Sequence, residues 1–171
     1  MINLNKLAQR VHQANINWWR DIDTGKPINR NPMEILALVV SEISECLEGE
    51  RKNLMDDKLS HRKMAEVEMA DAAIRLLDFA GGFGHRLGNV QLLDPIPDNK
   101  GEALFNLMGF VWNISGAATS AWINLSLAYI ERYCKKHGYD LWGAFEEKML
   151  YNAHRADHKP SVRRADGGKK F

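Results

Sequence analysis

Two stretches of the chain place acidic side chains in pairs within apolar sequence, and this feature most limits how the chain can fold. VVSEISECLEGER contains Glu42 and Glu45, and VEMADAAIRLLDF contains Glu68 and Asp71. Because the members of each pair are three residues apart, both point from one face of a helix. Carboxylates among apolar neighbours are unfavourable unless they pair with another group. On adjacent helices, the four groups would form a cage for a hard divalent cation such as Mg²⁺.

The rest of the chain also has the pattern of helices. Apolar residues recur every three or four positions, and no segment has the convincing period-two alternation of a strand. Asn31-Pro32 is a typical helix start, Ser60 is a candidate cap for the next helix, and Gly81-Gly82 is a natural helix stop. The 171 residues are enough for one hydrophobic core. We therefore predict an all-α fold, a four- to five-helix bundle with helices at about 4–20, 31–52, 61–80, 103–136 and 139–155.

The segment 103–130 contains 28 residues without a charge, which is long enough to span a bilayer. Its middle, SGAATS, is small and polar, and no cluster of Lys and Arg flanks one side. We interpret it as a helix that is buried on nearly all sides, which in a small protein suggests packing between subunits. We therefore expect no membrane association and a homo-oligomer, either a dimer or a tetramer.

Cysteine and charge indicate the compartment and the partner. Cys46 and Cys134 have no CxxC partner and are expected to be buried thiols in a reducing compartment. The opening MINLNKLAQR does not resemble a signal peptide, so we predict a cytoplasmic protein. The net charge of +1 gives no argument for a nucleic-acid partner. The charge is uneven, however: it is +4 from His154 onward and −3 before it, which suits an anionic ligand bridged by metal.

Each acidic pair alone is a weak signal, because a solvated charged face is the usual role of glutamates on a helix. The second pair follows the first after 22 residues (Cys46–Val67), the length of a helix end, a loop and half of a returning helix. Antiparallel packing would bring the pairs together. Carboxylates without histidine favour Mg²⁺, with Mn²⁺ as a substitute, and the Glu-x-x-His pairs of di-iron bundles are absent. Mg²⁺ held by carboxylates usually serves phosphate chemistry.

The acidic pairs also occur beside two further motifs. These are the run EMADAAIRLLDFAGG and the ending Lys148-x3-Asn152-x2-Arg155. Together they resemble the MazG-like all-α nucleoside triphosphate pyrophosphohydrolases, whose phage-type members often end in a glycine-lysine tail like GGKKF here. The resemblance covers about residues 1–83 and 137–171. It implies one catalytic domain at 1–160, with an inserted segment at about 84–136, and a basic, flexible tail at 161–171.

The resemblance implies a reaction, (d)NTP plus water to (d)NMP plus pyrophosphate, with water attacking the α-phosphorus. Glu42, Glu45, Glu68 and Asp71 would hold Mg²⁺, and Glu45 is our candidate for the base that takes the proton of the water. The residues expected to contact the substrate are Lys148, Asn152, Arg155, Asn15, Trp18, Lys169 and Lys170. The first three would contact phosphates or sugar, and the two lysines would close over the phosphates.

Asn15 and Trp18 lie in the region where the family places its contacts to the base. Trp18 and Trp19 are adjacent and do not both face one core, so one is expected to be exposed enough to stack on a base. Phage-type relatives act on deoxynucleotides, including purines such as dGTP, and would work in the cytoplasm of a bacterium or of a phage-infected host. Two alternatives stay open: a dUTP-directed member of the same superfamily, and a non-catalytic helical oligomerisation module.

Overall fold

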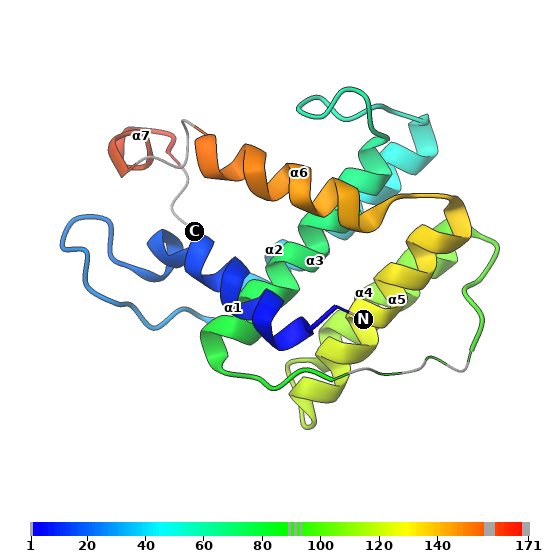
Figure 1. Cartoon of the computed structure of the whole chain (residues 1–171), viewed down its shortest axis with the longest axis horizontal. Coiled ribbons are helices and arrows are strands. Elements are labelled where there is room, and N and C mark those ends of the chain that lie inside the picture. The colour runs from blue at the N-terminus through cyan, green and yellow to red at the C-terminus, as the bar shows by residue number, and fades with distance from the viewer. Residues whose placement is uncertain (1, 89, 91, 93, 156–159, 169–171) are drawn as a thin grey trace.

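The computed structural model is all-helical over the residues it describes, which are 2–88, 90, 92, 94–155 and 160–168. Within these ranges, β structure is limited to two isolated bridges, Arg20–Pro27 and Met55–Lys63. The predicted all-α class is therefore confirmed. The helices, in chain order (Figure 1), are α1 (Leu4–Ala14), the 3₁₀ helix η1 (Ile16–Trp19), α2 (Pro32–Lys52), α3 (Met64–Phe83), α4 (Lys100–Asn113), α5 (Thr119–His137), α6 (Leu141–His154) and α7 (Pro160–Arg164).

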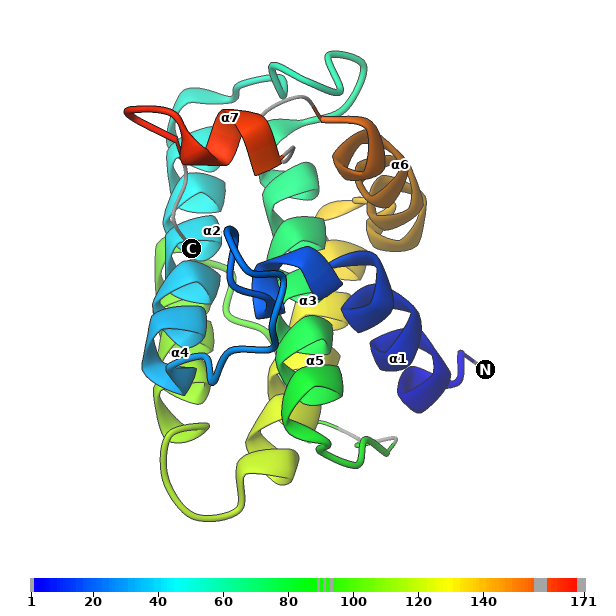
Figure 2. The same ribbon diagram turned by 90° about the vertical axis from the view of Figure 1, so that its left-hand side faces the viewer.

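Helix α3 lies at the centre of the molecule, with α1, α2, α5 and α6 packed around it. Figure 2 shows α2 on one side of α3 and α1 with α6 on the other. Most of α3 is buried, including small residues such as Ala70, Ala72 and Ala73. Small side chains allow neighbouring helices to approach closely, and a helix that is apolar around most of its circumference is typical of a core position. The acidic residues of α3 are therefore carried into the interior.

The first helix ends earlier than predicted. The pattern indicated a helix over 4–20, but α1 stops at Ala14, and residues 16–19 form a 3₁₀ turn. This turn separates the two adjacent tryptophans: Trp19 is 8% exposed and enters the core, whereas Trp18 lies only partly buried at its edge. The indole Nε1 of Trp19 donates to both carboxylate oxygens of Asp78, at 3.1 and 3.2 Å. Tertiary packing of Trp19 thus overrides the local helical pattern.

The predicted boundaries of α3 are wrong at both ends. Ser60 does not cap it, since α3 begins at Met64 after Lys63 and has no side-chain cap. Gly81-Gly82 does not end it either, because the helix continues to Phe83 and Gly84 has the left-handed conformation. The two glycines instead allow α1 and the ring of Trp19 to lie close to the backbone of α3. A Cβ at Gly81 would lie 2.7 Å from the Ala8 carbonyl oxygen, and one at Gly82 would lie 2.2 Å from the Trp19 ring.

The long uncharged helix is two helices. The sequence predicted one helix over about 103–136, but α4 ends at Asn113 and α5 begins at Thr119, with Ala118 in the left-handed conformation. The break falls in the small, polar SGAATS segment, and the two helices pack against each other as a hairpin. In the described part of the chain, no helix is both long and apolar enough to cross a membrane.

The close approach at Gly82 gives a test of the fold. Ala in place of Gly inside a helix normally raises stability by about 0.5–1 kcal/mol. We expect Gly82→Ala to have the opposite sign, lowering the free energy of unfolding by about 1–3 kcal/mol through overpacking against Trp19. Gly109→Ala in α4 is the matched control, because a Cβ there meets no atom within 4 Å. Urea denaturation measures both, and equal stabilisation by the two variants would contradict the packing.

Candidate functional site

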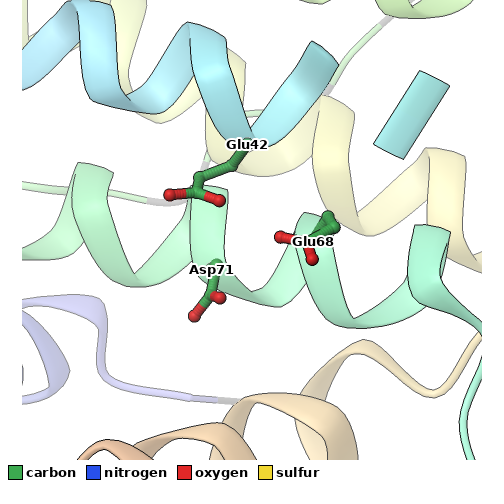
Figure 3. Close-up of side chains that lie close together, drawn as sticks. All are labelled: Glu42, Glu68 and Asp71. Atoms are coloured by element: carbon green, nitrogen blue, oxygen red, sulfur yellow. The ribbon is translucent and has the colours of Figure 1, made fainter. Parts of the chain in front are cut away.

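Three of the four predicted metal ligands converge between α2 and α3 (Figure 3). Glu42 comes from α2, and Glu68 and Asp71 come from α3. One carboxylate oxygen from each residue lies within 4.8 Å of the others. The chain turns back between the two helices through residues 53–63, so the pairing that the 22-residue spacing predicted brings these side chains together. Glu42 and Glu68 are each 6% exposed, so the group is largely removed from water.

Two cations lie against this acidic group. Nζ of Lys148, on α6, is 2.8 Å from Oδ2 of Asp71, and the lysine is 5% exposed. Nε of Arg75, on α3, donates to Oε1 of Glu42. Arg75 lies four residues after Asp71 on α3, yet its ion pair crosses to Glu42 on α2. Arg75 pairs with Glu42 and Lys148 pairs with Asp71, and neither of these two cations forms an ion pair with Glu68.

Burial and mutual repulsion raise the pKa of two of the carboxyl groups. Burial is the main cause at Glu68, and the charges of Asp71 and Glu42 add to it, so its pKa lies well above the usual 4.5. Burial also raises the pKa of Asp71, to about 6, although Lys148 acts in the opposite direction. Carboxyl groups whose pKa is raised by burial and by neighbouring carboxylates are typical of sites that bind a cation.

Glu45 is placed differently from the other three predicted ligands. It lies one turn after Glu42 on α2, is exposed, and does not belong to the group within 4.8 Å. Its assignment as a ligand and as the base stays a prediction. Lys169 and Lys170, expected to close over phosphates, lie outside the described residues.

A cavity of about 100 Å³ opens beside the acidic group and gathers the other predicted residues. Asp71 lies in its wall, so one carboxylate of the acidic group borders the cavity. Four of the residues predicted to contact the substrate also line it, and they come from the junction of α1 and η1, from η1, from α6 and from the residue after α6: Asn15, Trp18, Asn152 and Arg155. Lys148 is absent from this lining but reaches the cavity wall through its ion pair with Asp71. The side-chain oxygen Oδ1 of Asn152 is buried without a hydrogen-bond partner among the described residues.

Two polar residues of the lining were missed by the sequence reasoning. Arg30 lies in the loop before α2, and Asp78 lies two turns after Asp71 on α3. Asp78 is 8% exposed, receives the indole N–H of Trp19, and lies 2.9 Å from Nδ1 of His12. Burial raises the pKa of this carboxyl group. Asp78 follows Asp71 by seven residues, so helical spacing places both on one face of α3 and could have indicated Asp78 as a site residue. Arg30 lies in an irregular loop, where no sequence pattern indicates a position near the site.

The described part of the C-terminal segment packs beside this cavity. Helix α7 brings Arg163 over the ring of Trp18, with 3.8 Å between the guanidinium carbon and the ring centroid. Arg163 is 4% exposed and donates to the backbone oxygen of Asn17 at 3.1 Å. Arg164 donates to Asp23 at 2.9 Å. The described residues 161–168 belong to the segment predicted as a basic, flexible tail, and through Arg163 they contact the turn that carries Trp18.

The arrangement thus combines a buried cluster of hard oxygen ligands, basic side chains and an aromatic ring around one cavity. Such a site can take an anion that carries both phosphate and a planar ring. Comparisons of the chain with protein-family models, with curated proteins and with solved structures find no match.

The raised pKa of Glu68 predicts a pH-dependent stability in the presence of a chelator. Above pH 4.5, the usual pKa of glutamate, the unfolded chain loses this proton while the folded chain keeps it, so stability falls as pH rises. Glu68→Gln removes the titration. We expect the variant to be more stable than the wild type by on the order of 2 kcal/mol at pH 8. The difference should vanish below pH 4, and thermal unfolding at both pH values measures it. A variant less stable at pH 8 would show that Glu68 is structural.

Proposed function

We propose that this protein is a Mg²⁺-dependent nucleotide pyrophosphohydrolase that converts a (d)NTP to (d)NMP and pyrophosphate. One observation carries the proposal: Asp71 of the acidic cluster lines the same cavity as Asn15, Trp18, Asn152 and Arg155. A cluster of solvated surface carboxylates would have no reason to share a cavity with an aromatic ring and the basic end of α6. The resemblance of the motifs to MazG-like enzymes supports the same reaction.

The donor set fits Mg²⁺. Glu42, Glu68 and Asp71 provide hard oxygen ligands, and no histidine or cysteine belongs to the group. Its carboxylates repel one another and raise the pKa of Glu68, and a divalent cation would relieve this repulsion. In the reaction, Mg²⁺ would neutralise charge on the phosphate oxygens. Glu45, which is exposed one turn after Glu42 on α2, stays our candidate for the base that would take a proton from an attacking water.

The remaining residues suit the two ends of a nucleotide. Lys148, Asn152 and Arg155 are spaced four and three residues apart and lie toward one face at the end of α6. We assign them to the phosphates and sugar, with the unpaired Oδ1 of Asn152 as an acceptor for a hydroxyl group. Trp18 is assigned to the base, which its ring would contact by stacking. The cavity holds only part of a nucleotide, so we expect the rest of the substrate to extend past Arg155 toward solvent.

Compartment and assembly are part of this proposal. Cys46 and Cys134 are both free and buried, which supports a reducing, cytoplasmic location. We also propose that the enzyme is a homo-oligomer that acts on free nucleotides rather than on nucleic acid. The base remains to be assigned among deoxynucleotides, with dGTP and dUTP as the first candidates.

The proposed reaction predicts a specific product. Incubation with each dNTP and Mg²⁺ should release pyrophosphate and the monophosphate, and EDTA should abolish turnover. Glu42→Gln, Glu68→Gln and Asp71→Asn should each lower kcat on the order of 100-fold or more, because each removes a ligand carboxylate. Their helical content, measured by circular dichroism, should stay unchanged. Glu102→Gln, in the first turn of α4, is a matched control that should keep full activity.

Three results would contradict the proposal: release of orthophosphate, no turnover with any nucleotide, or turnover that the three ligand variants leave intact. A protein that is folded but inactive throughout the panel would instead favour the non-catalytic oligomerisation module. The Glu45→Gln variant answers a separate question, since full activity would remove Glu45 from the mechanism without affecting the metal assignment.

The contact between Arg163 and Trp18 predicts a role of the C-terminal segment in substrate binding. Loss of this buried guanidinium in Arg163→Ala should loosen Trp18 and raise KM about tenfold, with a smaller effect on kcat. Arg164→Ala is the matched control: this neighbouring arginine is exposed, pairs with Asp23 and should be nearly neutral. Steady-state kinetics measure the KM of both variants. Equal KM values would exclude a role for Arg163 in holding Trp18.

A further inference from the structure

An apolar groove between α2 and α4 is separate from the cavity described above. Its walls include Met33, Ala37 and Val40 on α2 and Met108 and Gly109 on α4. Two aromatic side chains border it, Phe105 at 75% exposure and Trp112 at 78% exposure. All the side chains that line the groove are uncharged. Exposed aromatic residues gathered around an apolar groove are typical of a protein–protein interface.

The groove lies on the far side of α2 from the candidate site. At 100° per residue, Ile35, Leu38 and Glu42 project from one side of α2, and Met33, Ala37 and Val40 project from the opposite side. The first set lines the cavity or belongs to the acidic cluster, and the second lines the groove. In Figure 2, α2 and α4 run together along the edge of the molecule that faces away from α1 and α6. A partner in the groove would therefore leave the cavity open.

The shape of this face is complementary to itself. Phe105, Met108, Gly109 and Trp112 follow the i, i+3, i+4, i+7 spacing of one helix stripe. The two aromatic side chains project at the ends of the stripe, and the middle is hollow, since a Cβ at Gly109 would meet no atom within 4 Å. If two copies of α4 cross antiparallel between Met108 and Gly109, Phe105 of one copy lies opposite Trp112 of the partner subunit. This crossing pairs each aromatic side chain with an aromatic of the other copy, and the open space at Gly109 lets the two helices approach closely at the two-fold axis.

The available area is also sufficient. An aromatic side chain buries about 150–250 Å² when it is enclosed, so Phe105 and Trp112 together offer roughly 300 Å². A stable interface needs about 800 Å² from each partner. The two aromatics would supply more than a third of it, and Met33, which is 46% exposed, with the groove walls would add to the rest. The absence of charge means that the partner surface must also be uncharged, and a second copy presents that surface.

We propose that the face formed by the α2–α4 groove and its two bordering aromatics is a homodimer interface, in which Phe105 of each copy packs against Trp112 of the partner subunit and the two α4 helices cross beside Gly109. The interface is independent of the nucleotide site and of the reaction proposed for it. The two sites lie on opposite sides of α2, so each dimer carries two outward-facing cavities.

Sedimentation velocity over a dilution series of the full chain tests the proposal. The wild type should be a dimer at micromolar concentration, and Trp112→Asp and Phe105→Asp should each raise the dissociation constant of the dimer by roughly 100-fold, because buried aromatics dominate interface energies. Gly109→Leu should weaken the dimer while keeping both aromatics, since the added side chain would hold the two α4 helices apart where they cross. A Cβ at Gly109 meets no atom within 4 Å, so this substitution should not disturb the fold of the monomer. A weaker dimer in this variant would therefore not be explained by misfolding.

Leu150→Asp is the matched control. Leu150 is 65% exposed but lies on α6, so its replacement also puts a carboxylate where an exposed apolar side chain was and should leave the dimer intact. Circular dichroism should show native helical content in all four variants. A monomeric wild type would overturn the proposal and point to a different partner. Dimers that persist in both Trp112→Asp and Gly109→Leu, or that dissociate in Leu150→Asp, would overturn it as well. None of these measurements uses a nucleotide, so failure of the interface is distinct from failure of the proposed reaction.

Discussion

The burial of three carboxylates between α2 and α3 is the constraint on which the rest of the structure depends. Glu42, Glu68 and Asp71 lie close enough for like charges on them to repel one another, and burial raises the pKa of Glu68 and of Asp71. The helices stay together because apolar residues pack tightly on the core side of the same contact, among them Val39, Ile43 and Met69. Packing thus holds in place a group that would otherwise separate the two helices.

The same group fixes the position of α6. The buried ion pair between Asp71 and Lys148 sets where α6 lies along α3, since leaving either partner unpaired would be strongly unfavourable. Asn152 and Arg155 follow Lys148 by one and two helical turns, so the pair also determines how far they reach over the cavity. Another buried carboxylate of α3, Asp78, positions the opposite wall of the cavity. It binds the Trp19 indole, and the tight turn that buries Trp19 presents Trp18 to the cavity. Two acidic residues of α3, two turns apart, therefore organise both walls.

The parts that could be predicted from the sequence depend on local periodicity. Helical spacing and the length of the connection were enough to place Glu42, Glu68 and Asp71 together, because two helices joined by a short connection pack against each other. What failed depends on contacts between distant segments. The glycines at 81 and 82 look like a helix stop, yet they serve close approach by Ala8 and Trp19, which no local pattern indicates. The break at residues 114–118 has a weak local signal that the surrounding apolar residues concealed. Arg75 could reach Asp71 or Glu42, and only the packing of α2 on α3 decides for Glu42.

The two sides of α2 suggest how a stable fold can keep a cluster of carboxylates that repel one another. On one side, the helix carries a carboxylate into an acidic cluster whose repulsion the proposed cation would relieve. On the other side, it carries apolar residues that remain exposed until a partner covers them. The proposed cation on one side and the proposed partner subunit on the other would each stabilise the folded state by mass action. Because the surfaces lie on opposite sides of one helix, the stability gained from association would help to hold α2 against the repulsion at Glu42 without obstructing the cavity. Assembly and metal binding would then both stabilise α2, and the unfavourable charge arrangement that a cation site needs could be kept in the free protein.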